Sequence, residues 1–376
     1  MMRYRDFGRM GYKVSALGFG AMRLPEDGGG RVDVDAAVAL VRAAVDAGVN
    51  YVDTAPFYSH DQSEETVGRA LRDGYRERVW LSTKYFHAAE DGADDYRRKL
   101  EASLAKLGTD YLDVYHFWGV SWEAFDAALR PRGLVAAARR CREEGLFRHL
   151  FFSFHAPPED LTRLIDTGEF DGCTVQYNLI DRRYEQGLAH AAARGLGVVV
   201  MGPVGGGRLA GPSSVIAGLP IRSASTPELA LRFVLANRNV NCALSGMGDR
   251  RMLAENLATA ARAEPLAPAE LAAVEAGFDE FQKLAELYCT GCNYCAPCPA
   301  KVPIARILSL YNLARVYGLE EAAVALYDDI GKRGFFASAA DATACNSCGE
   351  CSEKCPQKLD IPAELAAAHD DLNHGR

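Results

Sequence analysis

Residues 51–71 read YVDTAPFYSHDQSEETVGRAL. The stretch begins with a short apolar run, crosses a polar turn, and continues from residue 63 with the periodicity of an amphipathic helix. A strand followed by a helix is the repeating unit of parallel α/β folds, in which helices cover both faces of the sheet. Further copies of this unit lie on both sides of it along the chain.

Eight apolar runs in the first 265 residues have the composition of buried strands. They lie at 15–22, 51–55, 79–84, 111–118, 149–155, 173–178, 197–203 and 240–246. Helical patterns lie between them, among others at 36–48, 63–73, 96–108 and 227–238. Eight strand–helix units in about 250 residues predict a (β/α)8 TIM barrel, which we assign to residues 1–265.

A doubly wound sheet is the alternative α/β architecture. It would carry a phosphate-binding Gly-x-Gly-x-x-Gly turn after its first strand. Residues 18–30, GFGAMRLPEDGGG, do not supply this turn in the right place. The barrel is therefore favoured, and residues 3–15 are expected to form a hairpin that closes its bottom.

Composition and charge limit the function classes. The chain has 376 residues, 49% of them hydrophobic, and a net charge of −8, which argues against nucleic acid as a partner because phosphate binding needs a basic face. The N-terminus has no apolar signal region, and no window of 18 apolar residues predicts a membrane span. We expect a cytoplasmic protein without a membrane partner, in which clustered cysteines indicate metal or redox chemistry.

Eight of the eleven cysteines fall in two motifs near the C-terminus. Residues 289–299 read CTGCNYCAPCP and residues 345–356 read CNSCGECSEKCP. The second motif has the spacing of bacterial ferredoxins, and the first is one residue shorter before its last cysteine. These motifs predict two [4Fe–4S] clusters held by Cys289, Cys292, Cys295, Cys298, Cys345, Cys348, Cys351 and Cys355. Structural zinc is the alternative, although zinc modules usually use separated Cys-x2-Cys pairs.

The two motifs are halves of a repeat. Each is followed by Pro-x-Lys-aliphatic-x-Ile, as PAKVPI and PQKLDI. In two-cluster ferredoxins the fourth cysteine of each motif binds the other cluster, so we expect Cys355 to join Cys289, Cys292 and Cys295, and Cys298 to join the second triplet. The linker between the motifs has helical periodicity. We predict a connecting helix at 266–288 and a small α-helical, ferredoxin-like domain at 289–376.

Polar residues at the ends of neighbouring strands predict a catalytic site, because chemistry in such barrels sits at the carboxyl ends of the strands. Asp53 and Tyr58 follow the second strand, Lys84 ends the third, and His116 lies in the fourth. A lysine cation lowers the pKa of a nearby phenol, so Tyr58 is expected to give a proton to a carbonyl oxygen, with Asp53 holding Lys84. A buried structural ion pair beside an ordinary tyrosine is an equally weighted alternative.

These residues resemble the signature of the aldo-keto reductases. Residues 51–71 resemble the family's Asp-Thr-Ala-x-x-Tyr and Ser-Glu motif, residues 11–25 its entry strand, and residues 81–84 its lysine strand. Residues 201–209, MGPVGGGRL, and 244–256, LSGMGDRRMLAEN, resemble its cofactor segments. The resemblance extends over residues 4–262, and the whole chain resembles the subgroup with a C-terminal ferredoxin-type domain. It implies a nicotinamide-dependent oxidoreductase in which Asp53, Tyr58 and Lys84 are catalytic.

The chain departs from the family at the fourth catalytic position. The family's histidine corresponds to Trp118, and His116 lies two residues earlier on the same strand face. His116 is compatible with two roles, polarising the substrate carbonyl from a shifted position or serving as a satisfied core histidine. His60 and His87, on the loops after the second and third strands, are other candidate substitutes, and an exposed loop histidine is the favoured alternative for each.

The resemblance also implies a set of cofactor-binding residues. Phe154 replaces the asparagine after the family's strand-5 serine, and Met201 replaces an aromatic residue that stacks on the nicotinamide. Neither NADP nor NAD is favoured, because the arginines that would contact a 2′-phosphate also fit a solvated helix start. The implied residues are Met22, Ser153, Gln176, Met201, Pro203, Gly205, Gly207, Arg250, Arg251 and Asn256.

The sequence thus predicts an NAD(P)H-dependent reductase or dehydrogenase that acts on a carbonyl compound or the matching alcohol. A nicotinamide moves two electrons and a cluster moves one, and no flavin motif is evident. The clusters are therefore structural, redox-sensing, or connected to a separate electron-transfer partner. The alternative function is an electron-transfer or redox-sensing protein whose barrel binds nicotinamide without turnover.

Overall fold

The computed structural model describes the chain except for residues 29, 263–264, 287, 290, 334–335 and 374–376. The chain forms two compact units. The first contains residues 1–203 and 231–265, and the second contains residues 204–230 and 266–376. Each unit is thus built from two separate segments of sequence.

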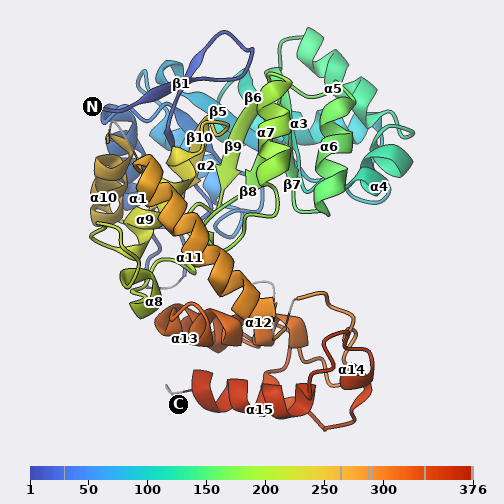
Figure 1. The fold of residues 1–376 in the computed structure, drawn as a ribbon. Helices are drawn as coiled ribbons and strands as arrows, with labels where there is room; N and C mark the ends of the chain where they lie inside the picture. The colour runs from blue at the N-terminus through green and yellow to red at the C-terminus, as the bar shows by residue number, and fades with distance from the viewer. Residues whose placement is uncertain (29, 263–264, 287, 290, 334–335, 374–376) are drawn as a thin grey trace. The chain divides into compact units, whose positions relative to one another are not determined.

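The first unit is a closed parallel barrel in the strand order β10-β3-β4-β5-β6-β7-β8-β9, with helices around it (Figure 1). All eight predicted strands are confirmed. Their alternating side chains fill the interior, so the barrel is a packed core rather than a channel. The strands are β3 (Leu17–Gly20), β4 (Tyr51–Asp53), β5 (Trp80–Tyr85), β6 (Leu112–Phe117), β7 (Phe147–Phe154), β8 (Gly172–Gln176), β9 (Gly197–Met201) and β10 (Cys242–Ser245).

Helices follow the strands as the sequence pattern predicts. The Asp33 side chain caps the first, and Asp249 caps the last in the same way, because a carboxylate at the N-cap accepts an otherwise unpaired backbone N–H. The helices are α1 (Val34–Asp46), α2 (Ser63–Ala70), α3 (Ala93–Leu107), α4 (Trp122–Ala124), α5 (Leu134–Glu143), α6 (Pro158–Asp166), α7 (Glu185–Ala193), α9 (Thr226–Ala236) and α10 (Arg250–Ala260).

The predicted hairpin is also confirmed, as β1 (Tyr4–Asp6) paired antiparallel with β2 (Lys13–Ser15). Its turn carries Phe7, which is fully buried. The Phe7 ring packs edge-on against Tyr51, Trp80 and Phe151, with centroids 5.6–5.7 Å apart. Tyr51 and Trp80 are the first residues of their strands, so the hairpin closes the amino-terminal end of the barrel.

The second unit is helical in its C-terminal part. Helix α12 packs against α13 and α15 (Figure 1, orange to red), and no helix of the described residues is long and apolar enough to cross a membrane. The helices are α8 (Ser214–Ala217), α11 (Pro268–Glu286), α12 (Ile304–Arg315), α13 (Glu320–Asp328), α14 (Glu350–Glu353) and α15 (Ile361–Leu372).

The two cysteine motifs and the segments that follow them share backbone conformation as well as sequence. Lys301 and Lys358 both have positive φ, 59° and 54°, and their N–H groups donate to the carbonyls of Cys298 and Cys355 at 3.0 Å. Inside the two loops, Gly291 and Asn293 have positive φ, as do the corresponding Ser347 and Gly349. Helices α12 and α15 begin at the same place in each half, at an isoleucine.

Candidate active site and cysteine-lined cavities

Asp53 and Lys84 form a buried ion pair at the carboxyl ends of β4 and β5. The Lys84 Nζ lies 2.5 Å from Asp53 Oδ1 and also donates to the carbonyl of Thr54 at 2.8 Å. The Lys84 and Asp53 side chains are 3% and 4% exposed. Burial by itself would lower the pKa of Lys84, but the Asp53 carboxylate outweighs it and the net shift is upward. The lysine is therefore a fixed cation at neutral pH.

Tyr58 lies directly beside this cation. The Lys84 Nζ is 4.6 Å from the centroid of the Tyr58 ring. Burial raises the pKa of Tyr58 above its usual value, and Lys84 opposes the shift without cancelling it. The expected net lowering of this pKa is thus not found, because the desolvation of a phenolate exceeds its attraction to one lysine. The phenol is fully protonated at neutral pH, as a proton donor must be.

His116 lies inside the barrel with partners at both ring nitrogens. Its Nε2 is 2.8 Å from Thr174 Oγ1, and its Nδ1 is 3.2 Å from Ser82 Oγ. The Ser82 hydroxyl donates to Asp53 Oδ2 at 2.8 Å. These bonds assign the Nδ1–H tautomer, with Thr174 donating to Nε2. Burial lowers the pKa of His116 to about 3, so the ring is neutral.

This network includes a residue that the sequence analysis missed. Ser82 connects the carboxylate of Asp53 to the ring of His116. Its position two residues before Lys84 puts both side chains on one strand face, which is the signal that could have identified it. His116 has no N–H left for a substrate, so of its two predicted roles the geometry favours the satisfied core histidine.

Trp118 joins an aromatic group beside Tyr58. Its ring centroid lies 5.4 Å from Phe86, 5.9 Å from Phe57 and 6.2 Å from Tyr58. Phe57 and Phe86 are 53% and 45% exposed. The group follows three consecutive strands, β4 to β6, and presents an open apolar wall at their carboxyl ends. We name Phe57, Phe86 and Trp118 the aromatic wall.

Three residues implied for cofactor binding have polar partners in the first unit. The Gln176 side chain donates to Asp181 at 2.9 Å, and Asn256 donates to Ser245 Oγ at 3.0 Å. Ser153 Oγ accepts the N–H of Gly119 at 2.9 Å and keeps its own proton to donate. These contacts fix the three side chains without using all their hydrogen-bonding groups.

The other implied cofactor residues are distributed over both units. Met22 is 58% exposed, Met201 is half-buried and Pro203 is buried. Arg250 and Arg251 are exposed at the start of α10, with Arg251 paired to Glu255 at 3.3 Å. Gly205 and Gly207 belong to the second unit.

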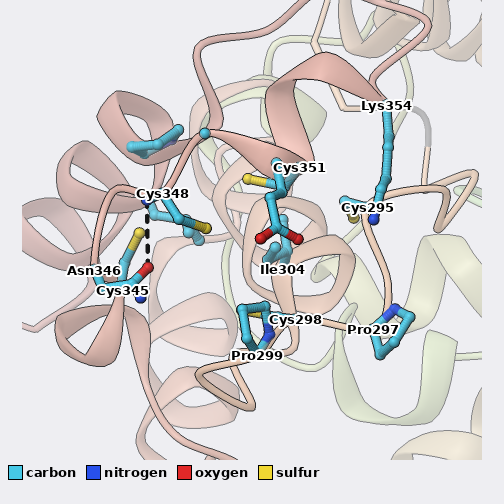
Figure 2. Close-up of a pocket in the computed structure, with 14 residues that line it drawn as sticks. Cys295, Pro297, Cys298, Pro299, Ile304, Cys345, Asn346, Cys348, Cys351 and Lys354 are labelled. Atoms are coloured by element: carbon cyan, nitrogen blue, oxygen red, sulfur yellow. Dashed lines mark hydrogen bonds between the residues drawn. The ribbon is translucent and has the colours of Figure 1, made fainter.

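The eight motif cysteines line two cavities in the second unit. Figure 2 shows the first cavity, which is lined by Cys295, Cys298, Cys345, Cys348 and Cys351. The second is lined by Cys289, Cys292, Cys295 and Cys355. Apart from Cys295, which lines both cavities, the cysteines divide as in the crossed pairing, and their role as ligands stays a prediction. The other three cysteines, Cys141, Cys173 and Cys242, are buried in the barrel unit.

The cavities have the chemistry of iron–sulfur sites. Ile304 lines both of them, Leu308 and Ile361 line one, and Leu365 the other. Among the described residues, no three His, Cys, Asp or Glu side chains are grouped closely enough to hold one metal ion. Thiols spaced around a cavity with aliphatic side chains in its lining suit a multi-atom cluster better than a single zinc ion, whose sulfur ligands must all lie about 2.3 Å from the metal. The residues therefore fit the iron–sulfur group.

Comparisons with known proteins agree with both parts of the chain. The model of the aldo/keto reductase family matches residues 16–214, more than half of the chain, and the model of a 4Fe-4S dicluster domain matches residues 288–359. L-galactose dehydrogenase of Arabidopsis thaliana is 28% identical over 289 residues, which cover 70% of this chain and 89% of that protein.

Solved structures give the same answer. An aldo-keto reductase from Bacillus halodurans in its holo form superposes with a TM-score of 0.64 and 25% identity, covering 74% of this chain and 96% of that one. A Klebsiella pneumoniae aldo/keto reductase in complex with NADP and acetate has a TM-score of 0.61 and 27% identity over the same shares. This chain therefore belongs to the aldo/keto reductase family, as an oxidoreductase with a C-terminal 4Fe-4S dicluster domain.

Proposed function

We propose that the protein is an NAD(P)-dependent reductase or dehydrogenase that interconverts a carbonyl compound and its alcohol. One observation supports it above the others: Lys84 is held 2.5 Å from Asp53 and 4.6 Å from the ring of Tyr58. A fixed cation beside a protonated phenol is the arrangement that proton transfer to a carbonyl oxygen requires. The relative solved with NADP supports the same cofactor class.

A bound reduced nicotinamide supplies hydride to the carbonyl carbon. As negative charge develops on the carbonyl oxygen, the Tyr58 O–H donates its proton there and the product is the alcohol. The phenolate that remains is stabilised by Lys84, which Asp53 and the Thr54 carbonyl hold in place. Because the ammonium is already oriented, its electrostatic stabilisation needs no reorganisation during the reaction. His116 acts as a positioning residue through Ser82.

The aromatic wall suggests the substrate class. Phe57, Phe86 and Trp118 expose apolar surface beside the reacting phenol, and exposed apolar surface of this kind binds apolar ligands. We propose an aromatic or otherwise apolar carbonyl. Trp122 does not belong to this wall, because its ring packs on Phe125 and beneath the Arg163 guanidinium.

The second unit is proposed to hold two [4Fe–4S] clusters with the crossed ligand sets. Three thiolates from one loop and the fourth from the other would hold each cluster, which would supply one-electron redox chemistry when bound. The paired conformations of Lys301 and Lys358 support equivalent roles for Cys298 and Cys355, because both cysteines occur at the same step of a repeated turn.

An electron-transfer protein whose barrel binds nicotinamide without turnover is the second candidate. The observation that favours it is the engagement of both His116 nitrogens inside the barrel, with Trp118 at the family's histidine position. With both His116 nitrogens occupied, Tyr58 is the one group that we identify as a proton donor to a substrate carbonyl.

One anaerobic experiment distinguishes the two functions. NADPH, then NADH, is mixed with a panel of aryl and alkyl aldehydes and ketones, and nicotinamide and cluster absorbance are recorded together. Nicotinamide oxidation that requires the carbonyl, with unchanged clusters, is the expected result. Cluster bleaching by nicotinamide without any carbonyl would overturn the reductase and identify an electron-transfer protein.

A further inference from the structure

Helices α12 and α15 use the same face to line the cysteine cavities. Ile304 and Leu308 of α12 line them, as do Ile361 and Leu365 of α15. The two residues of each pair are one helical turn apart, and both isoleucines lie at the same distance from the last cysteine of their motif. One turn further along this face, the residue is polar in both helices: an asparagine in α12 and a histidine in α15.

On α12 this residue is Asn312, which is buried and bonded to the first motif. Its Nδ2 donates to the carbonyl of Cys289, the first cysteine of that motif, at 2.9 Å. The Asn312 Oδ1 accepts from Nε and Nη2 of Arg315 at 3.2 and 2.9 Å. The Arg315 guanidinium also lies 3.5 Å from the ring centroid of Tyr288, the residue before Cys289. The amide is thus oriented by the arginine and bonded to the backbone of a predicted cluster ligand.

On α15 the corresponding residue is His369, which is connected to the second motif through Tyr327 of α13. The Tyr327 hydroxyl lies 2.7 Å from Nδ1 of His369 and accepts the N–H of Ala342 at 3.3 Å. The carbonyl of Ala342 accepts the N–H of Cys345, the first cysteine of the second motif, at 3.1 Å. Tyr327 and Ala342 are both buried, so these bonds are shielded from competing water.

We propose that Asn312 and His369 are equivalent positioning residues, each of which holds the first cysteine of one motif in place for one cluster. The inference rests on the proposed function, because it takes two [4Fe–4S] clusters with the crossed ligand sets as the bound groups. Neither side chain is itself a ligand, and each acts through the backbone of its motif. Outer partners that orient the ligands of a metal site typically contribute about 10- to 100-fold to its affinity.

The two positioning residues act on different clusters. Asn312 is bonded to Cys289, whereas the bonds from His369 lead to Cys345, which belongs to the other predicted ligand set. A loop released at its first cysteine can withdraw one of four thiolates, so that its cluster becomes accessible to a chelator while the other cluster keeps all its ligands. The repeat thus provides each cluster with its own support, an amide in one half and an imidazole–phenol pair in the other.

The test uses three cluster-loaded variants of the full chain. Asn312→Leu removes the donor to the first motif, and Tyr327→Phe keeps the ring but removes the hydroxyl that connects His369 to the second motif. Tyr294→Phe is the matched control, because Tyr294 lies inside the first motif and is 66% exposed. Iron release to a ferrous chelator is followed anaerobically by absorbance, and EPR spectra of the dithionite-reduced protein identify the cluster that is lost.

Each of the first two variants should weaken one cluster only. We expect Asn312→Leu to release the cluster whose signal is missing in Cys289→Ala about tenfold faster than wild type, and Tyr327→Phe to release the cluster missing in Cys345→Ala to a similar extent. Tyr294→Phe should release both at the wild-type rate. A general loss of stability of the unit would instead accelerate the release of both clusters together.

The outcomes separate this inference from the proposed clusters. Equal acceleration of both clusters, or the wild-type rate for both, overturns the inference and leaves the two clusters in place. A wild-type protein that lacks iron and acid-labile sulfide overturns both. If Asn312→Leu assembles no cluster, Asn312→Asp decides, because aspartate keeps the acceptor for Arg315 but cannot donate to the Cys289 carbonyl: selective loss of the Cys289 cluster supports the inference, and release at the wild-type rate overturns it.

Discussion

The site is held at the residue scale by a chain of hydrogen bonds in the barrel interior. It runs from Thr174 through His116, Ser82 and Asp53 to Lys84. Each buried polar group in it has a partner, as a low-dielectric interior requires. The Tyr58 phenol lies beside Lys84, where this chain of hydrogen bonds ends.

Tyr58→Phe tests the role of the phenol. Removing the hydroxyl deletes the proposed general acid and leaves the ring in place, so kcat should fall by about 10²- to 10⁴-fold. Nucleotide affinity should stay within about twofold, because the loss is in the chemical step. Tyr12→Phe, at a half-exposed tyrosine of the hairpin, is the control. Stopped-flow turnover at wild-type level in Tyr58→Phe would contradict the mechanism.

His116 makes stability depend on pH. Its pKa is about 3 in the folded protein and 6.5 without burial, so the unfolded chain binds the proton more readily. The stabilising contribution is complete above pH 6.5 and is lost as pH falls toward 3, by about 1.4 kcal/mol per pH unit. Between pH 7 and 5, wild type should lose about 2 kcal/mol more unfolding free energy than His116→Gln. Unfolding free energies are measured by urea denaturation at both pH values. An equal loss in wild type and His116→Gln would contradict the lowered pKa of His116.

At the scale of elements, the hairpin that stabilises the barrel and the proposed catalytic groups lie at opposite ends of the strands. The hairpin fills the amino-terminal end of the barrel with Phe7, and the proposed catalytic groups lie at the carboxyl ends of the strands. Gly197, at the start of β9, makes room for this ring, since a Cβ there would lie 2.8 Å from Phe7. A small residue in one element thus admits a large one from another.

Phe7→Ala and Tyr12→Ala remove two aromatic rings of the same hairpin that differ in burial. Phe7 is fully buried and Tyr12 is 48% exposed. The first change should cost about 3–5 kcal/mol of unfolding free energy because it leaves a cavity, and the second about 1 kcal/mol. Turnover of the folded protein should be unchanged in both. Unfolding free energies are measured by chemical denaturation. Equal losses for the two variants would contradict a role of Phe7 in filling the end of the barrel.

At the scale of the whole molecule, distant segments are joined into common sites. Cys355 lines the cavity of Cys289, Cys292 and Cys295, across more than fifty residues of sequence. The segment 204–230 is likewise part of the unit that begins again at residue 266.

Single cysteine variants test the crossed ligand sets. Cys289→Ala and Cys355→Ala should remove the same cluster, and Cys298→Ala and Cys345→Ala the other, because three ligands from one loop are not enough to complete either set. Low-temperature EPR spectra of the reduced proteins and iron per chain are the measurements. A shared spectrum for Cys345→Ala and Cys355→Ala would instead indicate that each motif binds its own cluster.

Much of this protein follows from local sequence. The apolar runs predicted all eight strands, because parallel strands are buried on both faces and need continuous hydrophobicity. The cysteine spacing predicted the dicluster domain, which the family comparison matches, because three thiolates on one loop depend only on neighbouring residues. Asp53, Tyr58 and Lys84 were nominated together by their places at strand ends, and the ion pair between Asp53 and Lys84 is present.

The tertiary structure alone decided what depends on depth and on distant partners. Both His116 and Trp118 lie on one strand face, but only the folded barrel puts His116 between Ser82 and Thr174 and leaves Trp118 at the open end. The direction of the Tyr58 pKa shift is set by burial, which strand spacing does not encode. The assignment of residues 204–230 to the cluster-bearing unit depends on contacts more than a hundred residues apart, such as Ser213 to Tyr317. The periodicity of a strand determines on which side of it a side chain lies, whereas tertiary packing determines how deeply that side chain is buried and which residues it contacts.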